Sequence, residues 1–269
     1  KAGIAARNVQ PGGWVIAWQY DDNRLAEHRH VTRAELDTLG DYKIVLVHFT
    51  GHGLAVNSAA MAAAGITEDS PNPPGGITLR GADGKLSGVF FENAAYPVYA
   101  RLPQLTAEQR LAALDAAQIK YASNGFTHMQ DGASNLPDVL FLKSPAAGSH
   151  LKLDLAMLPA SQNLDALFKH PELKFGSYEG HVKLEGIKFI LDGSPQARTG
   201  FFTRDYRNGA PDGHMPWHGT SNMTQDQFNA ETRRAFDKGW QLFVHANGDA
   251  AIDMAIKGSE RFTLAFFLN

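Results

Sequence analysis

The sequence predicts an α/β fold with about four βα units, which is half of a TIM (β/α)₈ barrel, and a large insertion before them. The chain has 269 residues, of which 43% are hydrophobic and 20% charged, so it can bury a sizeable core. Residues 1–104 are rich in loops, whereas helical and strand patterns alternate from Thr106 onward. Such alternation is typical of parallel strands joined by right-handed crossovers. A complete barrel of this kind takes about 250 residues, so four units make a partial one.

The first predicted domain, residues 1–104, contains short elements separated by turns. A capping box at Thr32–Glu35 predicts the start of a short helix, because the threonine hydroxyl and the glutamate can satisfy each other's backbone amides. The apolar run Lys43–His48 predicts a buried strand, and the small residues 58–64 predict a helix. Residues 82–85, A-D-G-K, predict a hairpin turn. This domain is therefore expected to be a structured insertion.

The second predicted domain, residues 105–269, contains the βα units. A second capping box at Thr106–Gln109 starts a long amphipathic helix that Gly125 ends. The elements expected after it are strands at 126–130, 151–158, 187–191 and 240–245, and helices at 163–170, at 224–238 and from Asp249 onward.

Composition excludes several classes of function. The net charge is −3 without long runs of one sign, so neither a nucleic-acid groove nor a polybasic membrane patch is expected. Cysteine is absent, which excludes disulfides and thiolate catalysis. No apolar run reaches the roughly 18 residues of a transmembrane helix. We expect a cytoplasmic protein, with a periplasmic or exported one left open, and residues 1–10 are typical of neither a signal peptide nor a domain start.

One lysine stands inside a predicted buried strand. Lys188 lies in the apolar run 187–191, which Asp192 and Gly193 follow. Desolvating an ammonium group is costly or lowers its pKa, so a lysine in this position needs a specific role.

Three polar residues stand at the carboxyl ends of predicted strands, namely Asp131, Asp192 and His245. Active sites of (β/α)₈ barrels are built at that face. Asp131 and Asp192 each precede glycine, so a role in a cap or turn is as open as a functional one. His245 follows four apolar residues, and a functional role is favoured over that of a core histidine.

These stretches together resemble the YtcJ-like branch of the amidohydrolase superfamily, which is also called amidohydrolase family 3 and includes N-substituted formamide deformylase and AepA-like proteins. Residues 186–199, G-I-K-F-I-L-D-G-S-P-Q-A-R-T, and residues 245–253, H-A-N-G-D-A-A-I-D, carry the resemblance. Residues 52–88 are similar to the family's insertion between barrel strands one and two, and N-G-F-T-H-M-Q-D at 124–131 is similar to its second strand. The resemblance implies a chain that is an internal portion, holding barrel strands 2 to 5.

The resemblance also implies a metal site. Lys188 matches the family's carboxylated strand-four lysine and His245 its strand-five histidine. A lysine whose pKa falls on burial can react with CO₂ to form a metal-bridging carbamate, and neutral imidazole is a good zinc ligand. The implied cofactor is a divalent metal, and zinc is favoured over other divalent metals. The implied reaction is hydrolysis of an amide or related C–N bond in a small-molecule substrate.

The resemblance is incomplete at the other metal ligands. The family's strand-one H-x-H pair, strand-six histidine and strand-eight aspartate have no match, which leaves two of the six ligands. A catalytic zinc normally has three protein ligands, so we expect the truncated chain alone to be weak or inactive. The alternative is a non-catalytic regulatory or partner-binding remnant of the barrel. A half barrel exposes sheet edges, so a homo-oligomer or the missing remainder of the barrel is the expected partner.

Two residues are candidates for binding substrate. His52, in the insertion, is expected either to contact substrate or to fix its loop by hydrogen bonds. Arg198 is expected either to bind a substrate carboxylate or carbonyl or to form a surface ion pair. For Glu92 the favoured interpretation is a solvated carboxylate at a strand end.

Two histidine pairs have suggestive spacing but are not expected to bind metal. His28-Arg29-His30 stands in a loop just before a capping box. His214 and His218 flank Pro216, which prevents them from sharing one helical face, so an ordered loop is expected there.

Overall fold

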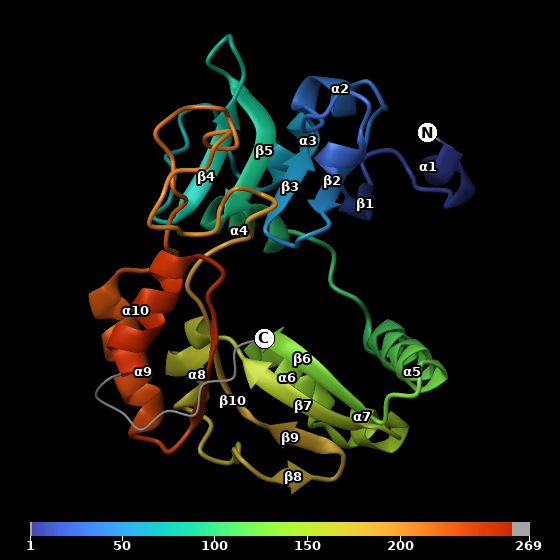
Figure 1. Cartoon of the computed structure of the whole chain (residues 1–269). Helices are drawn as coiled ribbons and strands as arrows, with labels where there is room; N and C mark the ends of the chain where they lie inside the picture. The colour runs from blue at the N-terminus through green and yellow to red at the C-terminus, as the bar shows by residue number, and fades with distance from the viewer. Residues whose placement is uncertain (1, 260–269) are drawn as a thin grey trace. The chain divides into compact units, whose positions relative to one another are not determined.

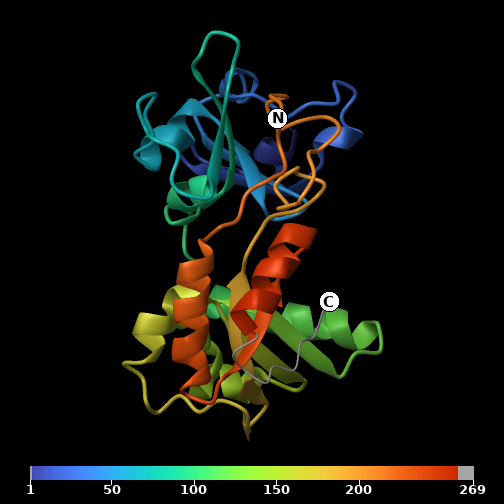
Figure 2. The same cartoon turned by 60° about the vertical axis from the view of Figure 1, so that its left-hand side comes forward.

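The computed structural model describes residues 2–259, and these form two compact units. Their segments can be followed by colour in Figure 1 and Figure 2. The first unit contains the chain up to Pro103 with residues 192–223 and 246–252, and the second contains residues 104–191, 224–245 and those from Asp253. The predicted domains, 1–104 and 105–269, stay a prediction, because they were defined by barrel strands rather than by spatial proximity.

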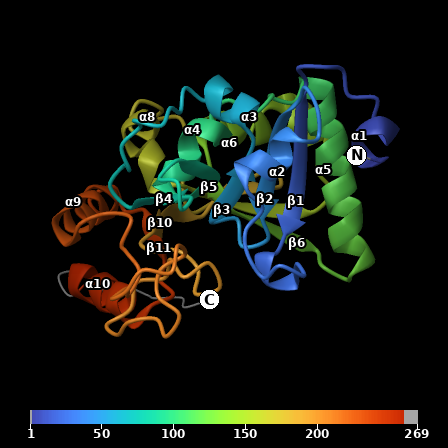
Figure 3. The ribbon, with the colours of Figure 1, turned by 90° about the horizontal axis from the view of Figure 1, so that it is seen from above.

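The first unit is built on a five-stranded sheet whose order can be followed from β1 to β4 in Figure 3. Its strands are β1 (Trp14–Tyr20), β2 (Lys43–His48), β3 (Gly53–Val56), β4 (Gly76–Arg80) and β5 (Leu86–Glu92), in the order β1-β2-β3-β5-β4. The β1–β2 pair is parallel and the other pairs are antiparallel. Side chains on the two sides of this sheet form two separate apolar clusters. The sheet is therefore packed on both faces.

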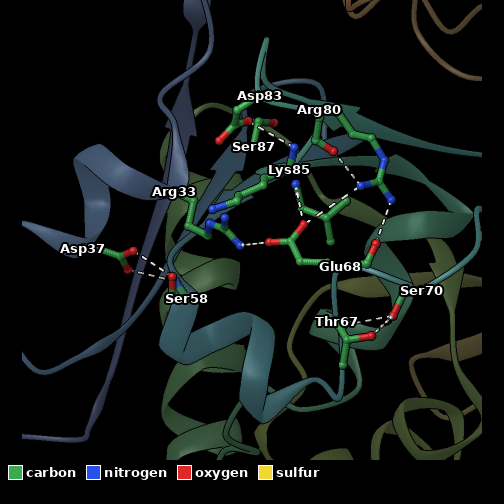
Figure 4. Close-up of polar contacts among 12 residues, drawn as sticks. Arg33, Asp37, Ser58, Thr67, Glu68, Ser70, Arg80, Asp83, Lys85 and Ser87 are labelled. Atoms are coloured by element: carbon green, nitrogen blue, oxygen red, sulfur yellow. Dashed lines mark hydrogen bonds and ion pairs between the residues drawn. The ribbon is translucent and has the colours of Figure 1, made fainter.

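Short helices surround this sheet. They are α1 (Ala2–Ala6), α2 (Arg33–Asp37), α3 (Ser58–Ala63) and α4 (Tyr96–Tyr99), with 3₁₀ turns at Asp22–Arg24 and Asn93–Ala95. The predicted capping box at Thr32 and the expected turn between β4 and β5 are both confirmed. Glu68 ties this hairpin to α2, because its carboxylate accepts hydrogen bonds from Arg33 and from the Leu86 amide (Figure 4).

The second unit alternates helices with short strands. Its elements are α5 (Ala107–Ser123), β6 (His128–Ser134), α6 (Leu136–Leu142), α7 (Pro145–His150), β7 (Asp154–Pro159), the 3₁₀ turn Ser161–Asn163, α8 (Leu164–Leu167), β8 (Tyr178–Glu179), β9 (Val182–Leu184), β10 (Gly186–Ile190), α9 (Gln225–Phe236), β11 (Gln241–His245) and α10 (Asp249–Ser259), whose first turn is grouped with the first unit. Helices α9 and α10 lie side by side (Figure 2), joined by a hydrogen bond from Gln225 to the Met254 carbonyl.

The strands of the second unit pair mostly in parallel. β7 pairs in parallel with β6 and β9, and β10 pairs in parallel with β11. An isolated parallel bridge joins Ala160 to Lys188, which places the end of β7 beside β10. The β8–β9 pair is antiparallel, so the four-stranded sheet β6-β7-β9-β8 is mixed, and neither sheet of this unit closes within residues 2–259. The α/β class is confirmed, whereas the half barrel stays a prediction.

The structure corrects two predicted boundaries. The strand expected at 126–130 is β6, His128–Ser134, so Asp131 lies inside the strand and not at its end. Residues 126 and 127 connect Gly125, which has φ 83°, to that strand. The helix expected at 163–170 is only the single turn Leu164–Leu167, because a 3₁₀ turn occupies its predicted start. Helices α6 and α7 were missed, although each follows a capping side chain and has proline as its first or second residue. No helix in residues 2–259 is both long and apolar enough to cross a membrane.

Candidate functional site

Lys188 and His245 lie on neighbouring parallel strands of the second unit. In the β10–β11 register Lys188 is opposite Phe243, and Ile190 is opposite His245. Side chains alternate between the two faces of a strand, so Lys188 and His245 share one face, two residues apart along it. The sequence prediction that these residues belong to one site is thus compatible with the register.

The opposite face of β10 packs against α9. Ile187 and Phe189 are fully buried, and the Phe189 ring meets the Phe228 ring of α9 edge-on at 5.5 Å. Lys188 therefore projects from the face that α9 does not cover. It is half-buried, and this burial lowers the pKa of its amine. None of the described residues of its own unit hydrogen-bonds or ion-pairs with Lys188 Nζ, so no carboxylate there holds the charge.

The Lys188 face fits part of a divalent-metal site. A neutral lysine amine or its carbamate, together with an imidazole, supplies two donors, and a catalytic zinc normally takes three. Within residues 2–259, one group of three carboxylate and imidazole side chains has its candidate ligand atoms, one from each residue, within 4.8 Å of one another. The group is Asp21, Asp22 and His48, in the first unit. His48 already bonds Asp22 at 3.0 Å and Thr50 at 2.8 Å through its two ring nitrogens. A cation there would have to displace these contacts.

A buried network in the first unit joins His52 to the loop after β10. His52 Nδ1 lies 3.1 Å from Glu92 Oε2, and the Thr199 hydroxyl donates to Glu92 Oε1 at 2.8 Å. The Ser194 amide donates to the Thr199 hydroxyl at 2.9 Å. A Cβ on Gly193 would lie 2.1 Å from Glu92 Oε1, so this position requires glycine. The network therefore explains the D-G-S sequence of the loop.

Glu92 is not the solvated carboxylate that the sequence favoured. It is 9% exposed, and its backbone has φ 51°, an uncommon conformation for a residue other than glycine. Burial lowers the pKa of His52, but the hydrogen bond to Glu92 and its charge, with a contribution from Asp192, outweigh burial and raise the pKa overall. His52 is thus biased toward the imidazolium form. Whether it contacts substrate stays a prediction.

Asp192 acts as an acceptor for three main-chain amides. It is fully buried, and its carboxylate accepts from Asn247 at 2.9 Å, Gly248 at 2.8 Å and Phe201 at 2.9 Å. These bonds connect the D-G-S loop to the H-A-N-G-D loop after β11. Asp192 therefore has the structural role in a turn that the sequence left open. Its hydrogen bonds account for the aspartate in the D-G-S loop and for the close approach of the Asn247 and Gly248 amides.

Arg198 is held by main-chain carbonyls. Its guanidinium donates to the Asn208 and Pro211 carbonyls, each at 3.1 Å, and it forms no ion pair with any residue from 2 to 259. The surface ion pair considered from sequence is therefore not found. Its backbone has φ 57°, so the loop holds Arg198 in a conformation that costs roughly 1 kcal/mol or more for a non-glycine residue.

The remaining histidines lie in polar pairs. His30 Nδ1 contacts the Tyr20 hydroxyl at 3.0 Å and lies 3.8 Å from Asp22, whereas His28 is exposed. His214 and His218 lie in a loop, as expected, where they pair with Asp212 and Asp205. Sequence reasoning missed the partnership of Asp22 with His48 and His30, because its members come from three separate segments. The local sequence feature that could have indicated this cluster is His48, a histidine that ends the apolar strand β2.

The predicted site residues therefore fall into two groups. Lys188 and His245 belong to the second unit, and His52 and Arg198 belong to the first, with Glu92 and Asp192.

The α/β fold is shared with a known class of hydrolase structures. A crystal structure of an uncharacterized metal-dependent hydrolase from Pyrococcus horikoshii OT3 matches 94% of this chain and 49% of its own, with TM-score 0.65 and 20% identity. At that identity the likeness shows the fold alone.

Sequence comparison identifies the family. A model of the amidohydrolase family matches residues 2–266, and the chain belongs to that family. It is 26% identical over 267 residues to the YtcJ protein of Bacillus subtilis strain 168, which covers 95% of this chain and 48% of that protein. It is also 26% identical over 264 residues to N-substituted formamide deformylase of Arthrobacter pascens, covering 94% of this chain and 47% of the deformylase. The chain spans about half the length of these relatives, and the predicted family resemblance is confirmed.

Proposed function

We propose that this chain is part of a metal-dependent hydrolase of amide or related C–N bonds, in which Lys188 and His245 supply two metal ligands. The observation that carries the proposal is their placement on one face of adjacent parallel strands. The family membership and the name of the deformylase relative support the C–N bond as the target. We place these strands in a partial (β/α)₈ barrel, as the fourth and fifth of its strands.

The lowered pKa of Lys188 suits the chemistry of a ligand. A neutral amine attacks CO₂, a C–N bond forms and a proton leaves to solvent, which gives a carbamate with two donor oxygens. In this proposal His245 supplies an imidazole nitrogen. A bound zinc or similar divalent cation would polarise the scissile carbonyl and lower the pKa of a coordinated water to about 7. Because two donors are fewer than a catalytic zinc needs, we propose that the chain alone is weak or inactive.

In this proposal His52 and Arg198 bind substrate. The Glu92 carboxylate fixes the His52 ring and favours its protonated form, which suits donation of a hydrogen bond to a carbonyl oxygen. The chain is expected to complete its sheet either with a second copy or with the remainder of the barrel. The family match gives no support to a non-catalytic remnant, so that alternative is not proposed.

Metal and carbamate measurements on the purified chain test the ligand assignment. We expect weak zinc binding by calorimetry and a carbamate carbonyl signal after incubation with ¹³C-bicarbonate, both lost in Lys188→Ala. His245→Ala should lose the zinc binding alone. The matched control is Lys183→Ala, because Lys183 is a nearby strand lysine paired with Glu185 at 2.8 Å. Zinc binding and a carbamate signal that both survive Lys188→Ala would refute the assignment, and rapid turnover of N-formyl amides by the chain alone would refute the expected weak activity.

A further inference from the structure

We propose that a cavity in the first unit, lined by Arg198 and His30, binds the carboxylate of a small organic monoanion. The inference rests on the proposed function and names its substrate class, an amide that also carries a carboxylate. The binding step itself needs neither the metal nor turnover.

The cavity has a volume of about 400 Å³, and all its lining residues belong to the first unit. Small-molecule sites are typically clefts of about 300–1,000 Å³ with a few placed polar groups. The lining that matters here is Asp22, His30, Arg80, Val89, Arg198 and Asp212. The space therefore fits a small substrate rather than a polymer.

The other arginines of the cavity already have partners. Arg29 binds the Glu35 carboxylate through two hydrogen bonds, at 3.0 and 2.7 Å. Arg80 donates to the Gly84 and Glu68 carbonyls, and it lies 3.9 Å from the Glu68 carboxylate (Figure 4). These two charges are therefore occupied within the fold.

The carboxylates of the cavity are also paired. Asp22 lies 3.0 Å from His48 Nε2, and Asp212 lies 2.6 Å from His214 Nδ1. Neither carboxylate contacts Arg198, which forms no ion pair with any described residue and binds two neutral carbonyls. Of the three arginines that line the cavity, Arg198 is therefore the one whose guanidinium pairs with no carboxylate of the described residues. A guanidinium carries five N–H donors, and two carbonyls leave most of them available to a planar carboxylate.

The loop orients this guanidinium. The neighbours of Arg198 in sequence, Ala197 and Thr199, are buried, and the Trp217 indole donates to the Arg198 carbonyl at 2.7 Å. The positive φ of Arg198 is kept in spite of its cost, and such outliers concentrate where a ligand requires them. His30 supplies a second polar group. When His30 Nδ1 accepts from Tyr20, the other ring nitrogen is a donor.

The charge balance favours a monocarboxylate over phosphate. Asp22 and Asp212 also line the cavity, and their charges would repel a dianion more than a monoanion. The planar fork of arginine suits carboxylate and phosphate alike, so the preference rests on the charges of Asp22 and Asp212.

Calorimetric titration with a matched pair of probes tests the inference, in EDTA so that no metal contributes. N-acetylglycine carries the carboxylate and N-acetylglycinamide lacks it. We expect N-acetylglycine to bind at least tenfold more tightly than the amide and than inorganic phosphate. Equal binding of the pair, or preferred binding of phosphate, would overturn the proposal.

Two variants locate the binding. Arg198→Gly removes the guanidinium while glycine tolerates φ 57°, so the fold should persist by circular dichroism and N-acetylglycine affinity should fall at least tenfold. Arg207→Gln, which changes an exposed arginine of the same segment, should leave affinity unchanged. Unchanged binding in a folded Arg198→Gly protein would refute the site. Because the titration is run in EDTA, its result does not depend on zinc binding by Lys188. A negative result here would therefore leave the metal-ligand proposal standing, and the reverse also holds.

Discussion

The two groups of site residues, one in each unit, differ in how many of their polar side chains have hydrogen-bond partners. In the first unit, Asp192 accepts three amides, and Glu92 is held by His52 and Thr199. In the second unit, Lys188 has no bonding partner among the described residues around it, and burial alone shifts its pKa. A satisfied buried network stabilises a fold, whereas a half-buried amine without a bonding partner favours a ligand.

This difference separates stability from binding. Changes in the first network should lower the free energy of unfolding, because buried donors lose their acceptors. A change at Lys188 should affect metal or carbamate chemistry and leave the free energy of unfolding unchanged or slightly higher. The comparison therefore ranks variants by effect on stability, with Asp192 first and Lys188 last.

Asp192→Asn should have the largest effect. The amide group replaces one accepting oxygen with a donor, so at least one of the three main-chain N–H groups that bond to the buried Asp192 carboxylate loses its partner. We expect the free energy of unfolding to fall by about 2–4 kcal/mol, measured by urea denaturation followed by circular dichroism.

The control is Asp205→Asn in the same segment. Asp205 is exposed and lies 3.4 Å from His218, so its loss should change stability by less than about 0.5 kcal/mol. Equal effects of the two variants would mean that the Asp192 bonds do not support the loops.

Local sequence signals predicted many of the elements. Thr32, Thr106 and Thr224 each begin a helix through a capping box, as a threonine with glutamate or glutamine three residues on indicates. The strand carrying Lys188 was predicted to within one residue. Such signals act over three or four residues, so a single sequence contains them.

Contacts between distant segments could not be predicted in this way. Glu92 and Thr199 are 107 positions apart, and nothing local to Glu92 indicates that its carboxylate is buried. Strand β1 was missed, since its pairing with β2 depends on a partner 29 residues away at Trp14 and Lys43. The register that puts Lys188 and His245 on one face likewise arises from tertiary pairing.

Glu92→Gln should have an intermediate effect that depends on pH. The variant keeps one acceptor for Thr199 and loses the charge beside His52. The His52 pKa is raised above 6.5 in the folded state, so the stabilisation is fully present below about pH 6.5 and is lost as pH rises through the folded pKa. We expect a loss of about 1–2 kcal/mol near pH 6 and a smaller loss near pH 9, measured by urea denaturation.

An exposed pair of the same type provides the control for that variant. His170 and Glu172 lie 2.7 Å apart on the surface, so Glu172→Gln should have little effect at either pH. A pH-independent effect of Glu92→Gln would show that charge pairing with His52 is not what stabilises the network.

Lys188→Met should have the smallest effect and the opposite sign. Burial lowers the Lys188 pKa from 10.5, so the folded state binds fewer protons than the unfolded chain, and wild-type stability rises with pH toward 10.5. Methionine removes that penalty and keeps the packing, so we expect between no change and about 1 kcal/mol of stabilisation near pH 7, with a weaker pH dependence. Lys183→Met, which breaks the pair with Glu185, should instead be neutral or slightly destabilising. A Lys188→Met protein that is clearly less stable than wild type would mean that the lysine has a bonding partner in the folded protein, and the contrast between the two groups would no longer hold.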